Sequence, residues 1–231
     1  MGLTVEPDLL WLPGVRFLVP VIAFVCLGFL RPADAQILAF GVKGGVRATT
    51  DVSGYPPVSN ESKRYIVGPA VELRLPLGFA VEFDALYRRF GYAQSSSSCC
   101  TTGTTRERAN SWEFPIIAKY RFSERGLHPF LGVGYDPRTV RGTDFSSGVY
   151  NLGLPGGPQY FSGQTSTANS FTGGLVVSGG FDLGARHLRI SPELRYVHWT
   201  QPFLNQYGPD GTYRIQSGQN EVFVLFGLMW R

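Results

Sequence analysis

Beyond residue 36 the sequence lacks any apolar run long enough for a membrane-spanning helix, and it shows neither heptads nor an amphipathic 3.6-residue pattern. If this part of the chain enters a membrane, it must do so as strands. An excess of one charge is also lacking. The formal net charge is only +4 and the basic residues are scattered, which argues against a nucleic-acid partner. What is abundant is glycine, at 29 residues, and aromatic residues, at 14%, a composition that suits an all-β chain.

Cysteine is scarce, with three in the whole chain. The two that follow the N-terminal segment, Cys99 and Cys100, are adjacent in a polar stretch. No other cysteine or histidine lies near them in sequence, so they do not indicate a metal site. A vicinal disulfide, a bridge to another chain and free thiols all stay open. We assign no metal ligand and expect no cofactor.

The N-terminal segment has the layout of a cleaved signal peptide. A basic residue precedes an apolar run over Phe17–Phe29, which is shorter than the ~20 residues that a helix needs to cross a bilayer. The small residues Ala33 and Ala35 predict cleavage before Gln36. We therefore expect residues 1–35 to be a signal peptide and residues 36–231 to form one exported domain.

Alternation of large apolar residues with small or charged ones recurs along the rest of the chain and predicts eight strands. They are Ile37–Arg47, Arg64–Leu75, Phe79–Tyr92, Asn110–Phe122, Pro129–Val140, Ser170–Leu183, Leu188–Thr200 and Asn220–Trp230. Three connections are short, namely Pro76–Gly78, Ser123–His128 and Gly184–His187. Four are long and polar, namely Ala48–Lys63, Ala93–Ala109, Arg141–Asn169 and Gln201–Gln219. Short and long connections in alternation are typical of an all-β, eight-stranded antiparallel up-and-down transmembrane barrel.

Side-chain volume decides which face of these strands points outward. A soluble barrel would show the same alternation with its faces exchanged. One face of the strands carries fifteen aromatic residues, however, and an eight-stranded interior cannot hold that many rings. The aromatic residues must therefore point out, while glycine, alanine and charged residues line the inside. The outward rings fall into two girdles, as expected at the two interfaces of a membrane. The girdle near the short turns comprises Phe40, Phe79, Phe122, Phe181 and Trp230, and the girdle near the long loops comprises Tyr65, Tyr87, Trp112, Tyr135 and Tyr196.

The terminal strand alternates through Val222, Val224, Phe226 and Leu228 to a final aromatic, Trp230. With the strand layout, this pattern resembles the small outer-membrane barrels of the OmpA transmembrane-domain and OmpX type, in the outer membrane protein beta-barrel domain family. The resemblance implies an outer-membrane location in a Gram-negative-type bacterium, with the long loops extracellular. It also implies that the outer-membrane assembly machinery reads the last strand and that the barrel contacts outer-membrane lipid and lipopolysaccharide. We expect a monomer, and the sequence does not identify the extracellular ligand.

The inward-facing positions carry a dense set of charges of both signs. It comprises Lys43, Arg47, Glu72, Arg74, Glu82, Asp84, Arg88, Glu113, Lys119, Arg121, Asp182, Arg189, Glu193 and Arg195. We expect Glu72 and Arg74 to face Glu82 and Asp84 across the Pro76 turn. The favoured interpretation is a salt-bridged plug in a barrel with a structural or surface-interaction role, because an unpaired buried charge is costly. The alternative is a narrow channel, in which exchangeable pairs let small ions pass.

One stretch allows an enzymatic hypothesis. His198, Thr200 and Gln201 resemble the histidine-x-serine-asparagine pattern of outer-membrane lipid A deacylases, in which histidine is the base for a hydroxyl nucleophile. Threonine and glutamine replace the serine and asparagine here. The preferred interpretation is that His198 and Trp199 are interfacial residues near the outer girdle. A palmitoyl-transfer enzyme is disfavoured because no amphipathic leading helix is found, and we assign no catalytic residue.

Overall fold

The structure is a computed structural model that describes residues 38–55, 58–97, 101–122, 127–150, 157–166, 170–185, 188–207 and 214–230. All of them belong to one compact unit, residues 36–231. The predicted signal peptide with Ala33, Ala35 and Gln36 lies outside the described residues, as do Cys99 and Cys100. Within the described part of the chain, no helix has the length and apolar character needed to cross a membrane.

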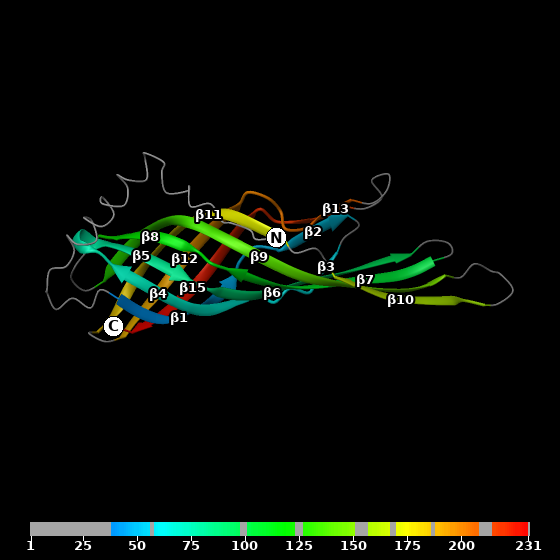
Figure 1. Cartoon of the computed structure of the whole chain (residues 1–231), viewed down its shortest axis with the longest axis horizontal. Coiled ribbons are helices and arrows are strands. Elements are labelled where there is room, and N and C mark those ends of the chain that lie inside the picture. The colour runs from blue at the N-terminus through cyan, green and yellow to red at the C-terminus, as the bar shows by residue number, and fades with distance from the viewer. Residues whose placement is uncertain are drawn as a thin grey trace, which may run out of the picture. The chain divides into compact units, whose positions relative to one another are not determined.

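The described elements are almost all strands (Figure 1). They are β1 (Leu38–Arg47), β2 (Val52–Tyr55), β3 (Ser59–Asn60), β4 (Tyr65–Arg74), β5 (Phe79–Asp84), β6 (Leu86–Ser97), β7 (Thr101–Glu113), β8 (Ile116–Arg121), β9 (His128–Tyr150), β10 (Gln159–Ser166), β11 (Ser170–Ala185), β12 (Leu188–Trp199), β13 (Asn205–Tyr207), β14 (Arg214–Ser217) and β15 (Asn220–Trp230). A 3-10 turn over Pro76–Gly78 joins β4 to β5.

Eight strand paths close into an antiparallel ring. The order is β1, β4, β5 with β6, β8 with β7, β9, β11, β12 and β15, and the last strand pairs back with the first. The closing register aligns Phe40 with Trp230 and Arg47 with Phe223. Closure pairs each strand on both sides, which satisfies the backbone hydrogen-bonding groups without water. The predicted eight-stranded barrel is confirmed.

Two strands that the sequence predicts as continuous, Phe79–Tyr92 and Asn110–Phe122, are each interrupted once, and the two interruptions lie next to each other in the sheet. Ala85 separates β5 from β6, and Phe114 with Pro115 separates β8 from β7. Pro115 has no N–H to donate, but its carbonyl accepts a hydrogen bond from the Asp84 N–H at 3.1 Å. The Phe114 N–H donates to the Pro137 carbonyl at 2.9 Å. The ladder is therefore bridged across the break, and side chains keep their inward or outward direction on both sides of it.

In two of the long polar connections most of the described residues form strands, which corrects the expectation of loops there. Within the predicted loops 93–109 and 141–169, β6 runs on to Ser97 and pairs with β7 from Thr101, while β9 runs on to Tyr150 and pairs with β10. Figure 1 shows β6, β7, β9 and β10 extending past the other strands at the end of the barrel opposite the short turns, called the loop end below. Their Ser, Thr and Gly residues meet water on both faces, so no alternation of apolar and polar residues marks them as strands.

The first and last long connections also contain strands. β2, β14 and β13 form a separate three-stranded antiparallel sheet. Val52, Leu204 and Ile215 from this region bury against Tyr92 of β6, so the small sheet is packed onto the barrel wall at the loop end. The described parts of these connections therefore add a small apolar cluster at the loop end of the barrel.

The outer surface of the barrel is apolar. Val133, Leu131 and Leu175 are about 60% exposed, and so large a continuous exposed apolar surface does not suit a protein in water. The predicted girdle rings all lie on this outer face. At the turn end, Phe79 and Tyr120 have ring centroids 5.0 Å apart, and at the loop end Tyr87 and Trp112 lie 5.3 Å apart. A surface of this kind needs lipid to cover it.

Candidate functional site

The interior of the barrel holds almost all of the buried charge, arranged in three groups along its length. The turn-end cluster comprises Glu72, Arg74, Arg121, Asp182 and Arg189. The central cluster comprises Lys43, Glu82, Asp84, Lys119, Glu193 and Arg195. The loop-end cluster comprises Arg47, Asp51, Arg88, Glu113, Arg138 and Glu221. Every charge that the sequence placed inside lies in one of the three.

The turn-end cluster is organised around two carboxylates. Glu72 accepts from the guanidinium groups of Arg121 at 2.6 Å and Arg189 at 2.8 Å. Asp182 accepts a hydrogen bond from Arg121 at 2.7 Å and forms an ion pair with Arg189 at 3.1 Å. Arg74 contacts Glu72 of its own strand at 3.1 Å. The expected contact of Arg74 with Glu82 or Asp84 is wrong, because the register aligns Arg74 with Ala80 and leaves Glu72 opposite Glu82.

The central cluster balances three basic groups against three carboxylates and is almost inaccessible to solvent. Lys43 contacts Glu82 and lies 2.8 Å from Glu193, while Lys119 donates to Glu82 at 2.7 Å. Arg195 spans Glu193 and Asp84, each at 2.8 Å. Each cation therefore meets at least two anions. Such sharing of partners offsets the desolvation of buried charges better than isolated pairs do.

The loop-end cluster includes charges that the sequence analysis missed. Arg88 contacts Glu221 at 2.6 Å and Glu113 at 2.8 Å. Arg138 lies 3.4 Å from Glu221, and Arg47 pairs with Asp51. Arg138 and Glu221 lie on strands that were predicted correctly, so strand alternation alone would have placed both inside. Asp51 belongs to a predicted loop, where no alternation could have found it.

Above this cluster, aromatic side chains fill the interior. We call Phe90, Trp199 and Phe203 the aromatic stopper. The rings of Phe90 and Phe203 have centroids 4.4 Å apart, and the Arg138 guanidinium lies 3.6 Å above the ring of Trp199. The fully buried position of Trp199 contradicts its expected place at the membrane interface. Its parity on β12, shared with Arg195, explains the difference.

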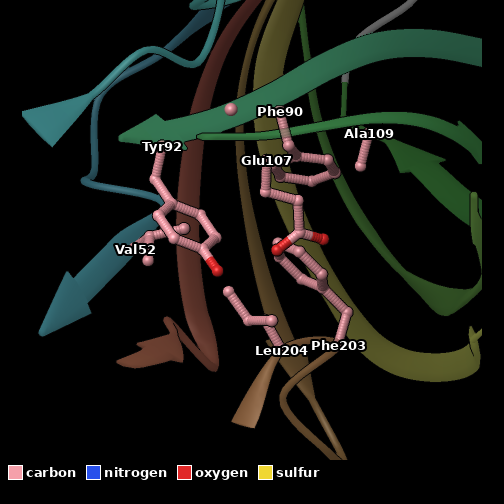
Figure 2. A pocket seen from close by; sticks show the side chains of 8 residues that line it. Val52, Phe90, Tyr92, Glu107, Ala109, Phe203 and Leu204 are labelled. Carbon is pink, nitrogen blue, oxygen red and sulfur yellow. The ribbon is translucent and has the colours of Figure 1, made fainter. Parts of the chain in front are cut away.

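The space left beside the stopper is small. A cavity of about 10 Å³, room for roughly one water molecule, lies among Phe90, Tyr92, Glu107 and Phe203. Figure 2 shows the Tyr92 hydroxyl and the Glu107 carboxylate directed into this space, with Phe203 beneath. These side chains occupy the interior at the loop end of the barrel.

The two residues of the enzymatic hypothesis, His198 and Thr200, each have another partner. His198 is exposed, as an enzyme acting on lipid requires, but its Nδ1 lies 2.7 Å from the Asn220 side-chain oxygen, which also accepts from the Tyr196 hydroxyl. The Thr200 hydroxyl donates to the Gly173 carbonyl at 2.9 Å. Neither group is directed at the other. The described residues also hold no group of three or more His, Cys, Asp or Glu side chains suited to a metal ion.

Several solved barrels are similar to this chain. They include the N-terminal β-barrel domain of OprF from Pseudomonas aeruginosa (11% identity, 84% of this chain and 97% of that one, TM-score 0.41) and OprG from the same organism (12%, 83% and 94%, TM-score 0.49). Neisserial surface protein A is similar at 14% identity, over 86% of this chain and 99% of that one, with a TM-score of 0.39. Identities this low concern the fold alone. No curated protein matches the chain.

Residues 34–198 match the family described as outer membrane protein beta-barrel domain. The match spans well over half of the chain and runs from the end of the N-terminal segment to β12. The ring of eight strands, the apolar outer surface and the charged interior are what an outer-membrane barrel requires. The chain belongs to the outer membrane protein beta-barrel domain family and is an integral protein of the outer membrane of a Gram-negative bacterium.

Proposed function

We propose that this protein is a closed, non-enzymatic barrel that anchors an extended β-sheet at the cell surface. The observation that carries the proposal is the filled interior: paired charges over most of its length and an aromatic stopper at the loop end. An ion that crossed such an interior would have to displace charge-assisted contacts of 2.6–2.7 Å in each cluster. A closed interior leaves the surface hairpins as the part able to act on other molecules.

Those hairpins favour contact with a partner. Beyond the barrel, β6, β7, β9 and β10 continue as one antiparallel sheet. Within the described part of the chain, β10 pairs with β9 alone, and its tip exposes Tyr160 by 79%. An edge strand of Ser, Gly, Gln and Thr without proline or charge offers free backbone donors and acceptors for strand addition. We propose that these hairpins face the cell exterior and present this edge to partners.

Conductance of the refolded chain in a planar bilayer tests closure. Folded protein is expected to give no discrete openings. The matched variant Trp199→Ala/Phe203→Ala removes two of the three stopper rings and leaves the charge clusters in place. Openings in this variant alone would show that the stopper, and not the charge clusters, seals the interior. Discrete openings of the unmodified chain that change with Glu82→Gln or Arg121→Gln would overturn the proposal in favour of a narrow channel.

Removal of the hairpin tests the surface role. In the first variant, a short Gly-Ser turn replaces residues 143–166 of the β9–β10 hairpin, and the second variant carries the point substitution Gln164→Lys on the β10 edge. We expect both variants to insert and fold, the first to lose cell-surface adherence and autoaggregation, and the second to weaken them. Unchanged adherence with a leaky or fragile envelope would instead assign the barrel a purely structural role.

The lipid A deacylase alternative has its own test. Lipid A from cells that express the protein, compared with lipid A from cells with the His198→Ala variant, should have the same acyl pattern. Loss of an acyl chain that depends on His198 would make the protein an enzyme and overturn the non-enzymatic proposal.

A further inference from the structure

A groove of about 630 Å³ runs along the outer, lipid-facing wall of the barrel where β6, β7 and β9 lie side by side. Its lining residues are Tyr87, Asn110, Trp112, Phe114, Thr139 and Arg141. The groove lies at the loop-end girdle, so it spans the level where acyl chains give way to headgroups. Its volume falls in the range of sites that hold small ligands.

The groove is apolar at one end and polar at the other. Toward the membrane centre, Trp112 and Phe114 are each 43% exposed and stack with ring centroids 6.4 Å apart. Toward the surface, the strand register places Asn110 directly opposite Arg141 on one side and Arg89 on the other. The Tyr87 hydroxyl donates to the Asn110 side-chain oxygen at 2.7 Å. The Asn110 amide nitrogen is therefore left to donate into the groove.

Arg141 lines the groove, Arg89 and Arg108 lie beside it on β6 and β7, and the charges of these three residues are not neutralised by any described side chain. Arg89, Arg108 and Arg141 all point outward and are exposed, and the described part of the chain offers none of them an ion-pair partner. The next arginine along β7, Arg106, does pair with a carboxylate, Glu61, at 2.8 Å. The acids of the same segments, Glu107 and Asp144, lie opposite each other in register on the inward-facing positions of β7 and β9. The outer face therefore gathers arginine without the neighbouring acids.

We propose that this groove binds the phosphate of an acylated outer-leaflet lipid. Arg89, Arg141 and the Asn110 amide would hold the phosphate, and the rings of Trp112 and Phe114 would pack against an acyl chain. Planar guanidinium groups suit phosphate because they donate two hydrogen bonds in parallel. This inference does not depend on whether the barrel interior conducts or on what the hairpins contact.

Native mass spectrometry of the refolded chain in zwitterionic detergent tests the proposal. The probe is lipid A carrying its phosphates, and the comparison probe is the same lipid after enzymatic dephosphorylation. The unmodified chain should retain the phosphorylated lipid alone. Arg89→Gln/Arg141→Gln should weaken retention by at least about tenfold, the loss expected from two charge-assisted hydrogen-bonding groups. Arg106→Gln, which changes an arginine already paired, is the matched control and should retain the lipid.

Three outcomes would overturn the proposal. One is equal retention of the dephosphorylated lipid, and another is unchanged retention by the double variant. The third is full displacement by millimolar inorganic phosphate together with no loss in Trp112→Ala, which would make the groove a site for free phosphate only. Heat-shifted gel migration of each variant establishes that the barrel has folded, and these exposed substitutions leave the interior untouched.

Discussion

At the residue scale, the buried charges are organised by shared partners rather than by simple pairs. Glu193 accepts from Arg195 and Lys43 at 2.8 Å, and Lys119 approaches it at 3.4 Å. Glu221 has a similar position between Arg88 and Arg138. Because each of these carboxylates contacts more than one cation, the loss of a single residue changes the charge balance of a whole cluster.

Lys43→Met should therefore be strongly destabilising. The substitution leaves the neighbouring Glu82 and Glu193 carboxylates short of one cation in a dry interior, and breaking a buried pair in this way costs about 3–5 kcal/mol. The free energy of unfolding in urea with detergent micelles measures the effect. Arg106→Ala, which removes the exposed pair with Glu61, should change it by less than about 1 kcal/mol. Equal effects of the two variants would show that the central cluster contributes no more than a surface pair.

At the element scale, the break between β5 and β6 depends on a glycine of the neighbouring strand, Gly68 of β4. Ala85 lies beside Gly68, and a Cβ atom added to Gly68 would meet the Ala85 carbonyl oxygen well inside van der Waals contact. The Ala85 N–H donates to the Pro69 carbonyl at 3.0 Å, which holds the two strands close at this point. Glycine is required here because the two backbones approach each other closely.

Gly68→Ala is accordingly expected to destabilise the barrel by about 1–3 kcal/mol, the usual range for overpacking. Gly44→Ala on β1 is the matched control, because the nearest atom to its added Cβ lies at 3.6 Å. The midpoint of the heat-shifted gel migration should fall for the first variant and stay for the second. A shift of the same size in both would mean that strand glycine content, and not the Ala85 contact, controls stability.

The elements also show what a single sequence can and cannot predict. Alternation located the ring strands because each has one lipid-facing and one interior side, as for Phe226 and Gly227 of β15. The extensions of β9 and β10 beyond the membrane have water on both sides, so Thr143 and Ser162 carry no such contrast. The inward aromatics were missed for a different reason. The volume argument excludes a large set of rings from the interior, but it does not exclude a few, such as Phe90 and Trp199, that fill one end of it.

At the scale of the whole molecule, the barrel reverses the usual arrangement of a soluble protein. Lys43, Arg138 and Arg195 are almost completely buried, whereas Val133 and Leu194 are more than half exposed. Hydrophobic burial therefore occurs against lipid, and the interior is held by charge pairs and hydrogen bonds. Strand closure makes this possible because it leaves no unpaired edge within the hydrocarbon.

Substitution on the outer wall measures this dependence on lipid directly. Val133 lies opposite Ala118 and Val177 in register, between the two girdles, so Val133→Arg would place a charge in the hydrocarbon. We expect it to lower the free energy of unfolding in lipid vesicles by about 2–4 kcal/mol, as arginine does near the bilayer midplane. Phe171→Arg, close to the loop end of β11, should cost only about 0–1 kcal/mol because the charge reaches the interface. Equal losses of unfolding free energy at the two positions would mean that the hydrocarbon does not cover the apolar wall between the girdles. A larger loss at Val133 places the hydrocarbon layer between the two aromatic girdles.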